Sequence, residues 1–220
     1  MLSMTKKWFT LSLTLVLVAI LAATFTGTVS AASTRSATSS AKIGHRGTLV
    51  TARNFRQFFP KAHIIHTKIG PNFVTCSSDS FQSYQNSKFV STELSYSGGN
   101  YAMLRARASQ LGPWEQYTVC VDDSTSLMTI QSQANGLFVS AELGYSGSSY
   151  AMLRARAASV GPWEQFFLYC GIPTCSIQSK ANGLFVAEED WYWGNGYGML
   201  RARTAPQNIG TWEEFIMNPA

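Results

Sequence analysis

The sequence predicts an all-β domain built from three copies of one unit, and three observations support this fold class. Only 13% of the 220 residues are charged, whereas 13% are aromatic and 17 are glycine, which excludes a charged disordered tail and a coiled coil. The motif Met-Leu-Arg-Ala-Arg occurs three times, and a Trp-Glu pair follows each copy. The tryptophans of these pairs are 49 residues apart, at Trp114, Trp163 and Trp212.

The first segment of the chain is typical of a secretory signal peptide. Lys6 and Lys7 precede an uncharged, mostly apolar stretch from residue 8 to residue 29, and small residues follow up to Ala31. We therefore expect cleavage near Ala31, so that residues 1–31 are removed and the rest is secreted. A retained membrane anchor is the alternative, because 22 apolar residues can cross a bilayer. Membrane contact is expected through this segment alone.

Residues 32–70 form a basic linker or arm in front of the repeats. Between residues 32 and 75 there are seven Lys or Arg and no Asp or Glu, whereas residues 76–220 carry a net charge of −4. Such an arm can bind anionic polymers by nonspecific electrostatics. The alternative is a solvated basic segment that balances an acidic domain. Leu, Phe and Ile residues between 48 and 69 indicate that part of the arm packs against the repeats.

Each repeat is predicted to contain four short strands. In the second repeat these are residues 128–132, 137–143, 151–157 and 163–169. A turn with Asn-Gly joins the first two strands, which is a strong hairpin signal. Apolar residues alternate with arginine in the third strand, as in a strand with one buried face. Three repeats give twelve strands, which fits a β-trefoil, because a propeller usually needs at least four blades.

The repeated motifs resemble those of the fascin-like β-trefoil repeat. The resemblance rests on the run from Ala134 to Glu142, on Leu-Arg-Ala-Arg at 153–156 and on Gly-Pro-Trp-Glu at 161–164. It implies one fascin-like β-trefoil, similar to a secreted bacterial branch that often accompanies glycoside hydrolases. It also implies a possible protein-interaction role, such as binding to an actin-like filament. The resemblance covers residues 71–220, with repeats at about 71–120, 121–170 and 171–220.

Four cysteines in a chain that we expect to be secreted indicate disulfides. We expect Cys76 to pair with Cys120, because they flank the first and fourth strands of one repeat, which are neighbours in a trefoil. We expect Cys170 to pair with Cys175 across a compact turn. A zinc site is the alternative, but the cysteine spacing does not fit one and the three histidines lie in the arm.

No set of residues predicts catalysis, a metal site or a cofactor. The sequence has no phosphate loop and no dinucleotide fingerprint, so we expect no enzyme activity and no specific nucleic-acid partner. Residues that recur in all three repeats usually solve a structural problem of the unit. We therefore expect each glutamate of the Trp-Glu pairs to pair with an arginine of its own repeat or to cap loop N–H groups. These glutamates are Glu115, Glu164 and Glu213.

We look for function where the repeats differ, in the loop between the second and third strands. The third repeat reads Trp-Tyr-Trp-Gly-Asn-Gly-Tyr at 191–197, and Ser or Gly replaces both tryptophans in the other repeats. Aromatic faces beside carboxylates and amides are typical of sugar sites, because rings stack on C–H groups while polar groups bind hydroxyls. The predicted site contains Trp191, Tyr192, Trp193, Glu189, Asp190 and Asn195, with weaker equivalents at Tyr96, Tyr101, Tyr145 and Tyr150.

The sequence thus predicts a secreted, monomeric, noncatalytic and lectin-like module that binds a polysaccharide or a cell-surface glycan. Four alternatives stay open. The tryptophan loop could be a hydrophobic latch over the barrel, the domain could bind a protein partner, the arm could bind anionic polymers, or the protein could be a secreted enzyme.

Overall fold

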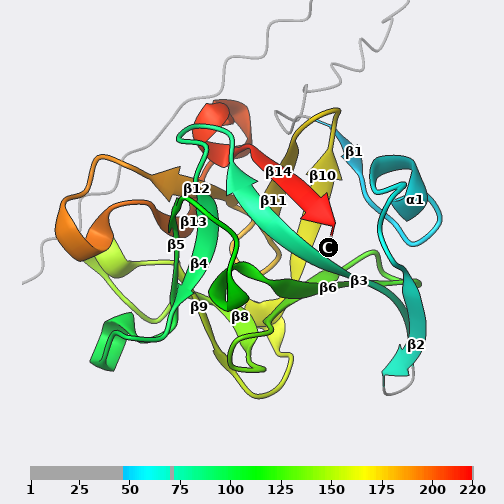
Figure 1. The fold of residues 1–220 in the computed structure, drawn as a ribbon, viewed down its shortest axis with the longest axis horizontal. Helices are drawn as coiled ribbons and strands as arrows, with labels where there is room; N and C mark the ends of the chain where they lie inside the picture. The colour runs from blue at the N-terminus through cyan, green and yellow to red at the C-terminus, as the bar shows by residue number, and fades with distance from the viewer. Residues whose placement is uncertain (1–46, 70–71, 220) are drawn as a thin grey trace, which may run out of the picture. The chain divides into compact units, whose positions relative to one another are not determined.

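The structure of the protein is a computed structural model that describes residues 47–69 and 72–219. The predicted signal peptide, with its cleavage position near Ala31, lies outside these residues. Within the described ranges the domain is all-β, as expected, with short 3-10 turns and a single short α-helix (Figure 1). None of the helices in this part of the chain is long and apolar enough to span a membrane.

Six strands pair antiparallel in a closed ring and form a barrel. Each strand pairs with the next along the ring, and the last pairs with the first. In ring order they are β3 (Asn72–Ser83), β6 (Tyr117–Asp122), β7 (Met128–Ser132), β10 (Phe166–Cys170), β11 (Cys175–Ser179) and β14 (Phe215–Pro219).

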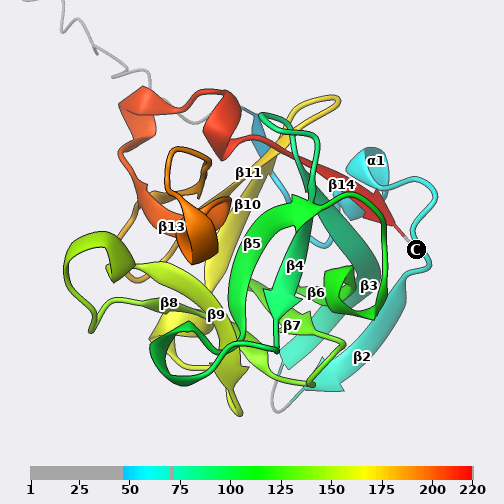
Figure 2. The same ribbon diagram turned by 60° about the vertical axis from the view of Figure 1, so that its left-hand side comes forward.

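Three further antiparallel hairpins belong to the same sheet (Figure 2). Their second strands pair with one another in a triangle, β5 with β9, β9 with β13 and β13 with β5. The hairpins are β4 (Phe89–Glu93) with β5 (Met103–Ala108), β8 (Phe138–Glu142) with β9 (Met152–Ala157), and β12 (Phe185–Glu189) with β13 (Met199–Thr204).

Short 3-10 turns occupy the loops at corresponding places. One kind lies inside the hairpin loops, a second kind contains the Trp-Glu pairs, and η6 lies in the longer last loop. The turns of the first kind are η1 (Gly98–Asn100), η3 (Gly147–Ser149) and η5 (Gly194–Gly196), those of the second are η2 (Pro113–Glu115), η4 (Pro162–Glu164) and η7 (Thr211–Glu213), and η6 is Pro206–Asn208.

The predicted strand at 163–169 begins later than expected. Trp163 lies in η4, and β10 starts only at Phe166. The reason is that Pro162 opens a 3-10 turn, where its missing N–H is tolerated, and that Glu164 caps this turn. The other three strands of this repeat begin and end within one residue of the predicted limits.

The barrel interior holds the residues that strand alternation assigns to it. Phe166 and Leu168 on β10 are fully buried, as are Tyr117 and Val119 on β6. A second, smaller apolar cluster lies under the triangle of hairpins. It contains Met103, Met152 and Met199, with Tyr96, Tyr145 and Tyr192 packed against it.

The described part of the arm packs onto the barrel, as its apolar residues predict. Strand β1 (Thr48–Leu49) pairs with β10, and β2 (Ile65–Ile69) pairs with β3. Between them α1 (Phe55–Phe58) places Phe55 in the main core, with no exposed surface. Gly47 has φ +111°, and a Cβ there would lie 2.5 Å from the backbone carbon of Cys170. Residues 47–69 therefore belong to the folded domain.

Both predicted disulfides are confirmed. Cys76 and Cys120 face each other on β3 and β6, and Cys170 and Cys175 face each other on β10 and β11. No free cysteine remains among the residues that the structure covers. Two disulfides are typical of proteins from oxidising compartments.

Candidate functional site

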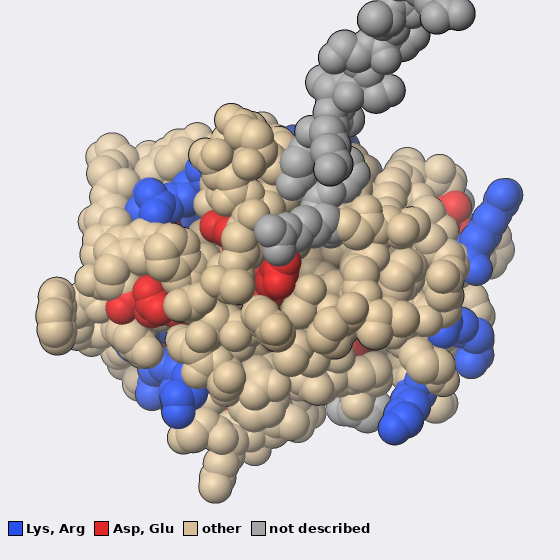
Figure 3. Space-filling model, turned by 90° about the horizontal axis from the view of Figure 1, so that it is seen from above, with Lys and Arg blue, Asp and Glu red and all other residues tan. Residues whose placement is uncertain are grey.

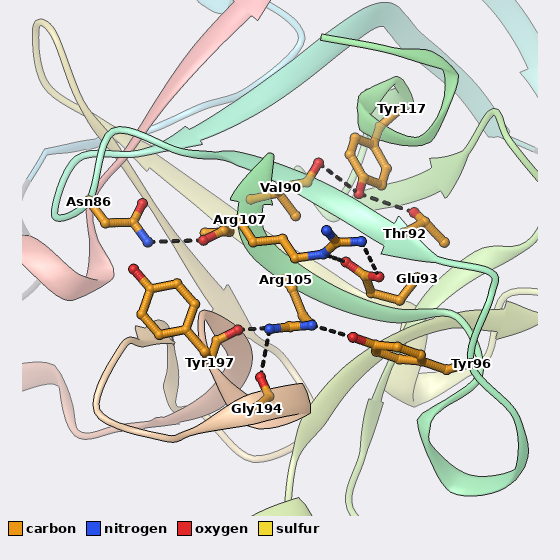
Figure 4. A network of polar contacts seen from close by, with 11 residues as sticks. Asn86, Val90, Thr92, Glu93, Tyr96, Arg105, Arg107, Tyr117, Gly194 and Tyr197 are labelled. Atoms are coloured by element: carbon orange, nitrogen blue, oxygen red, sulfur yellow. Dashed lines mark hydrogen bonds and ion pairs between the residues drawn. The ribbon is translucent and has the colours of Figure 1, made fainter. Parts of the chain in front are cut away.

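Each hairpin loop is held by an arginine from a different hairpin. In Figure 4, Arg105 on β5 reaches the third loop, residues 191–197. Its Nε donates to the carbonyl of Tyr197 at 2.7 Å, and its Nη2 donates to the carbonyl of Gly194 at 3.0 Å. Charge-assisted hydrogen bonds of this kind are stronger than neutral ones. The backbone around Trp193 is therefore fixed.

The same arrangement recurs around the triangle. Arg154 holds the first loop, residues 95–101, and Arg201 holds the second loop, residues 144–150. We call Arg105, Arg154 and Arg201 the locking arginines. The corresponding bonds run from Arg154 to Tyr101 O (2.8 Å) and Gly98 O (3.2 Å), and from Arg201 to Tyr150 O (2.8 Å) and Gly147 O (3.2 Å).

Three of the predicted sugar-binding tyrosines are only partly exposed, because their hydroxyls bind the locking arginines. The hydroxyl of Tyr145 accepts a hydrogen bond of 2.6 Å from Arg154, and that of Tyr192 accepts one of 3.2 Å from Arg201. Tyr96 accepts from Arg105 in the same way (Figure 4). The three side chains are half-buried, and their rings pack against the methionine cluster.

Glu189, predicted as a polar contact for sugar, is fully buried in the structure. Its carboxylate forms ion pairs with Arg203 and Arg201, the latter at 3.3 Å. Burial raises the pKa of Glu189, while the two guanidinium groups act in the opposite direction. Glu93 with Arg107 and Glu142 with Arg156 make the equivalent ion pairs in the other hairpins. Glu189 therefore supports the third loop from inside.

The glutamates of the Trp-Glu pairs cap loop backbone, which was one of the two expected roles. The carboxylate of Glu115 accepts from the N–H of Gly112 at 2.8 Å, and Glu164 accepts from Gly161 at 2.7 Å. Glu213 accepts from Gly210 at 2.7 Å. The arginines of the repeats pair with the glutamates at the ends of β4, β8 and β12 instead.

Trp191 is a half-packed aromatic platform. Its ring centroid lies 5.1 Å from that of Trp212, with the two planes at 67°. The guanidinium carbon of Arg203 lies 4.9 Å from the Trp191 ring centroid, which is cation–π geometry. The side chain is still 40% exposed. Trp212 recurs in every repeat, so the search for function where the repeats differ does not single it out, and its contact with the tryptophan loop shows only in the structure.

Trp193 is the most exposed large apolar side chain of the described domain, at 94%. It directly precedes η5, and its carbonyl accepts from the N–H of Gly196 at 3.3 Å. Asn195 and Tyr197 are exposed on the same loop, and Asp190 is half-buried beside it. The third loop thus combines a fixed backbone with an indole that contacts almost nothing in the protein.

No protein-family model matches this chain, and neither does any curated protein. Solved structures do match. ThreeFoil, a designed protein with threefold symmetry, is 14% identical over 64% of this chain and 96% of its own, with a TM-score of 0.53. A GlcNAcα1-4Gal-releasing endo-β-galactosidase from Clostridium perfringens gives 10% identity and a TM-score of 0.51, over 65% of this chain and 32% of the enzyme. An SDF2-like protein from Arabidopsis thaliana gives 8% and 0.50, over 64% and 91%.

The domain has a β-trefoil-like fold. At these identities the likeness establishes the fold alone, because one fold carries many functions. The site must therefore be judged from its own side chains.

A cavity of about 430 Å³ lies on the side of the trefoil, away from the predicted sugar residues. Several of its polar groups are already engaged within the protein: Lys180 Nζ donates to Gln165 Oε1 at 2.6 Å, and Gln131 Nε2 donates to Gly136 O at 2.7 Å. Its walls also include Val74, Phe138 and Val160. Its lining also includes polar side chains such as Asn72, Thr118 and Thr129.

A buried carboxyl lies on β12, the first strand of the third hairpin. Glu188 on β12 has no exposed surface, and Asn86 Nδ2 donates to its Oε1 at 3.0 Å. Burial, with a smaller contribution from Asp190, raises the pKa of Glu188 to about 8. The equivalent residues Thr92 and Ala141 carry no charge. Glu188 is thus a largely neutral acid at pH 7 that links β12 to the turn after β3.

Proposed function

We propose that this protein is a noncatalytic carbohydrate-binding module and that its main site is the third loop. The observation that carries the proposal is the 94% exposure of Trp193 on a backbone held by Arg105. An indole that stays exposed to water lacks the favourable free energy that its burial would provide. Because the loop backbone is fixed, the side chain cannot be buried by a change of loop conformation, and it remains available to a ligand. The face of an indole can stack on the C–H groups of a sugar ring.

Trp191 is the second platform in this proposal. Its ring is supported by Trp212 and Arg203, so its orientation is set before a ligand arrives. Asn195 and Asp190 supply polar groups for hydroxyls, and Glu189 acts only by positioning the loop. One structure of similar fold belongs to a galactosidase, which agrees with a carbohydrate ligand but adds little at 10% identity.

We further infer that the protein is secreted after cleavage near Ala31, that it is monomeric and that it is a fascin-like trefoil of three four-strand repeats. The two disulfides support an oxidising compartment. The locking arginines support a threefold repeat, because each makes the same contacts to the loop of the hairpin that precedes its own in the cycle.

The test is retention on insoluble polysaccharides, with cellulose, xylan, mannan, β-1,3-glucan and chitin as ligands. The full secreted chain is compared with the double variant Trp191→Ala/Trp193→Ala. We expect retention on at least one polysaccharide and a fall of about tenfold or more in the variant. Trp163→Ala is the matched control, because Trp163 is a 37% exposed tryptophan outside the loop. Equal retention of the double variant and the parent would refute the site.

A second candidate function rests on the surface of the arm. Arg53, Arg56, Lys61 and Lys68 are all exposed, and no acidic residue lies between 47 and 71. In Figure 3, Lys and Arg side chains project from the side where Figure 1 places α1 and β2, and others lie on the opposite side. Binding of an anionic polymer here would weaken steeply with salt. Heparin-column elution of the parent and of Arg56→Gln/Lys61→Gln/Lys68→Gln tests it, and equal elution would exclude this function.

A further inference from the structure

A small cleft of about 270 Å³ lies between the first and second loops. It is distinct from the Trp191–Trp193 platforms, because every residue that lines it comes from the other two hairpins. One wall is formed by the first loop and the other by the second loop and the start of β9. The lining residues are Gly99, Asn100, Tyr145, Ser146, Ser149 and Met152.

Three polar side chains in this cleft have unused hydrogen-bonding capacity. The amide of Asn100 and the hydroxyls of Ser146 and Ser149 make no hydrogen bond to any other described residue. An amide offers two donors and an acceptor, and each hydroxyl can both donate and accept. This combination matches the hydroxyl groups of a sugar, which also donate and accept.

Tyr145 gives the cleft an aromatic wall whose position is set. Its hydroxyl is held by Arg154 Nη1 at 2.6 Å, and its ring packs against the methionine cluster. The ring therefore cannot rotate away without breaking a charge-assisted hydrogen bond. A fixed ring next to unpaired hydroxyl and amide groups is the combination that sugar sites use.

The two walls are held at a fixed separation by two locking arginines. Arg154 bonds the carbonyls of Gly98 and Tyr101 in the first loop, and Arg201 bonds those of Gly147 and Tyr150 in the second. A ligand that enters the cleft therefore does not have to order the loop backbone, which lowers the entropic cost of binding.

The volume of the cleft and the absence of charged lining residues favour a small, neutral ligand. Pockets for drug-sized ligands start at about 300 Å³, so a cleft of about 270 Å³ suits a single hexose ring. None of the lining residues is charged, so nothing there selects an ionic ligand. The third loop has Trp193 at the position of Ser146, so this position carries a hydroxyl in the cleft and an indole in the third loop.

We infer that the cleft between Asn100 and Ser149 is a second carbohydrate site, which takes one neutral sugar ring. The inference rests on the proposed function, since it assumes the same class of ligand. It assigns the two sites different chemistry: the third loop stacks a sugar on exposed indoles, whereas the open cleft binds a ring mainly through hydrogen bonds. A polysaccharide that reaches both sites would gain avidity without tight binding at either one.

The test is an NMR titration of the full secreted chain with glucose, xylose, mannose, galactose and N-acetylglucosamine as probes. The backbone and side-chain amide signals of Asn100 report on the cleft, and the indole signals of Trp191 and Trp193 report on the third loop. We expect at least one probe to shift the signals of Gly99, Asn100 and Ser149. In the Trp191→Ala/Trp193→Ala variant these shifts persist.

Adding Asn100→Ala or Ser149→Ala to that variant weakens the remaining binding by about five- to tenfold, the usual effect of removing one hydrogen bond. Thr129→Ala in the 430 Å³ cavity is the control and changes nothing. If sugars shift only the indole signals, the second site is refuted and the proposed function stands. If they shift only the cleft signals, the third loop is not the main site. If no probe shifts either set and no polysaccharide is retained, both proposals fail.

Discussion

Arg105 donates a hydrogen bond of 3.0 Å to the carbonyl of Gly194, which directly follows the exposed Trp193. The two residues are 89 positions apart in the sequence and belong to different hairpins. The most exposed indole of the described domain is therefore presented by a loop whose geometry another hairpin determines. This contact connects the stability of the triangle of hairpins with the proposed binding site.

Replacing Arg105 by alanine should loosen the third loop. We expect polysaccharide retention to fall and the free energy of unfolding to drop by about 2 kcal/mol, because hydrogen bonds to a buried guanidinium are lost. Arg154→Ala is the comparison variant, since it releases the first loop, which is a wall of the proposed second site, and leaves the tryptophan loop anchored. Its retention should therefore fall less than that of Arg105→Ala. Retention and urea denaturation of both variants check this. Unchanged retention in Arg105→Ala would show that polysaccharide binding by the third loop does not depend on the hydrogen bonds from Arg105.

Glu188→Gln should change how stability depends on pH. The pKa of Glu188 is about 8 in the folded protein and 4.5 in the unfolded chain, so the folded state holds the proton more tightly. The stability from this group is complete below pH 4.5 and is lost as the pH rises through 8. Glutamine keeps the acceptor for Asn86 but cannot ionise. At pH 9 the variant should be more stable than the parent, by an amount on the order of 4 kcal/mol.

Urea denaturation at pH 5 and pH 9 measures this difference, which should nearly vanish at pH 5. A smaller slope remains in the variant between about pH 4 and 6, because burial raises the pKa of Asp79 to about 6. Parallel pH profiles for parent and variant would contradict the assignment to Glu188.

The two disulfides should differ in their contribution to stability. The Cys76–Cys120 bridge spans 44 residues and the Cys170–Cys175 bridge spans 5. The loop-entropy model assigns them about 4 and about 2 kcal/mol, because the longer loop restricts the unfolded chain more. Serine replacement of each pair, followed by urea denaturation, gives the two values. A larger loss for the shorter bridge would reverse this ranking.

Phe55→Ala should destabilise the whole domain. Phe55 lies in the arm but has no exposed surface and belongs to the main core, so its removal should cost about 3–5 kcal/mol. Phe73→Ala is the matched control, because Phe73 is 60% exposed. Thermal unfolding of the two variants distinguishes them. Equal melting temperatures would mean that the arm is not part of the cooperative unit.

Several features of the fold could be predicted because their signals are local or strictly repeated. The inward residues of β6 and β10 follow from alternation. The Cys76–Cys120 disulfide follows from strand neighbours, and Cys170–Cys175 follows from a compact turn. The start of β10 was predicted too early, because a Trp-Glu pair looks like strand and its capped turn shows only in three dimensions. The apolar composition of the arm was enough to predict that part of it packs against the repeats, as Phe55 does.

The site was harder to predict, because an arginine does not reveal which loop it will reach. Arg105 holds a loop of another hairpin, and nothing near it in the sequence indicates that partner. The position of Glu189 just before the tryptophans in the chain predicts a sugar contact. A signal against this was present, since Glu93 and Glu142 occupy the same place in the other repeats. Residues that recur in this way usually have a structural role.

The contacts of the locking arginines also form a cycle. The arginine of the first hairpin binds the third loop, that of the second hairpin binds the first loop, and that of the third hairpin binds the second loop. Every hairpin therefore contains an arginine that donates hydrogen bonds to another loop, and a loop that accepts such bonds from another arginine. Nothing in that cycle requires the hairpins to be covalently joined. Three separate copies of a single repeat would contain the same arginine-to-loop contacts, so the architecture is a target for design as a homotrimer of short chains.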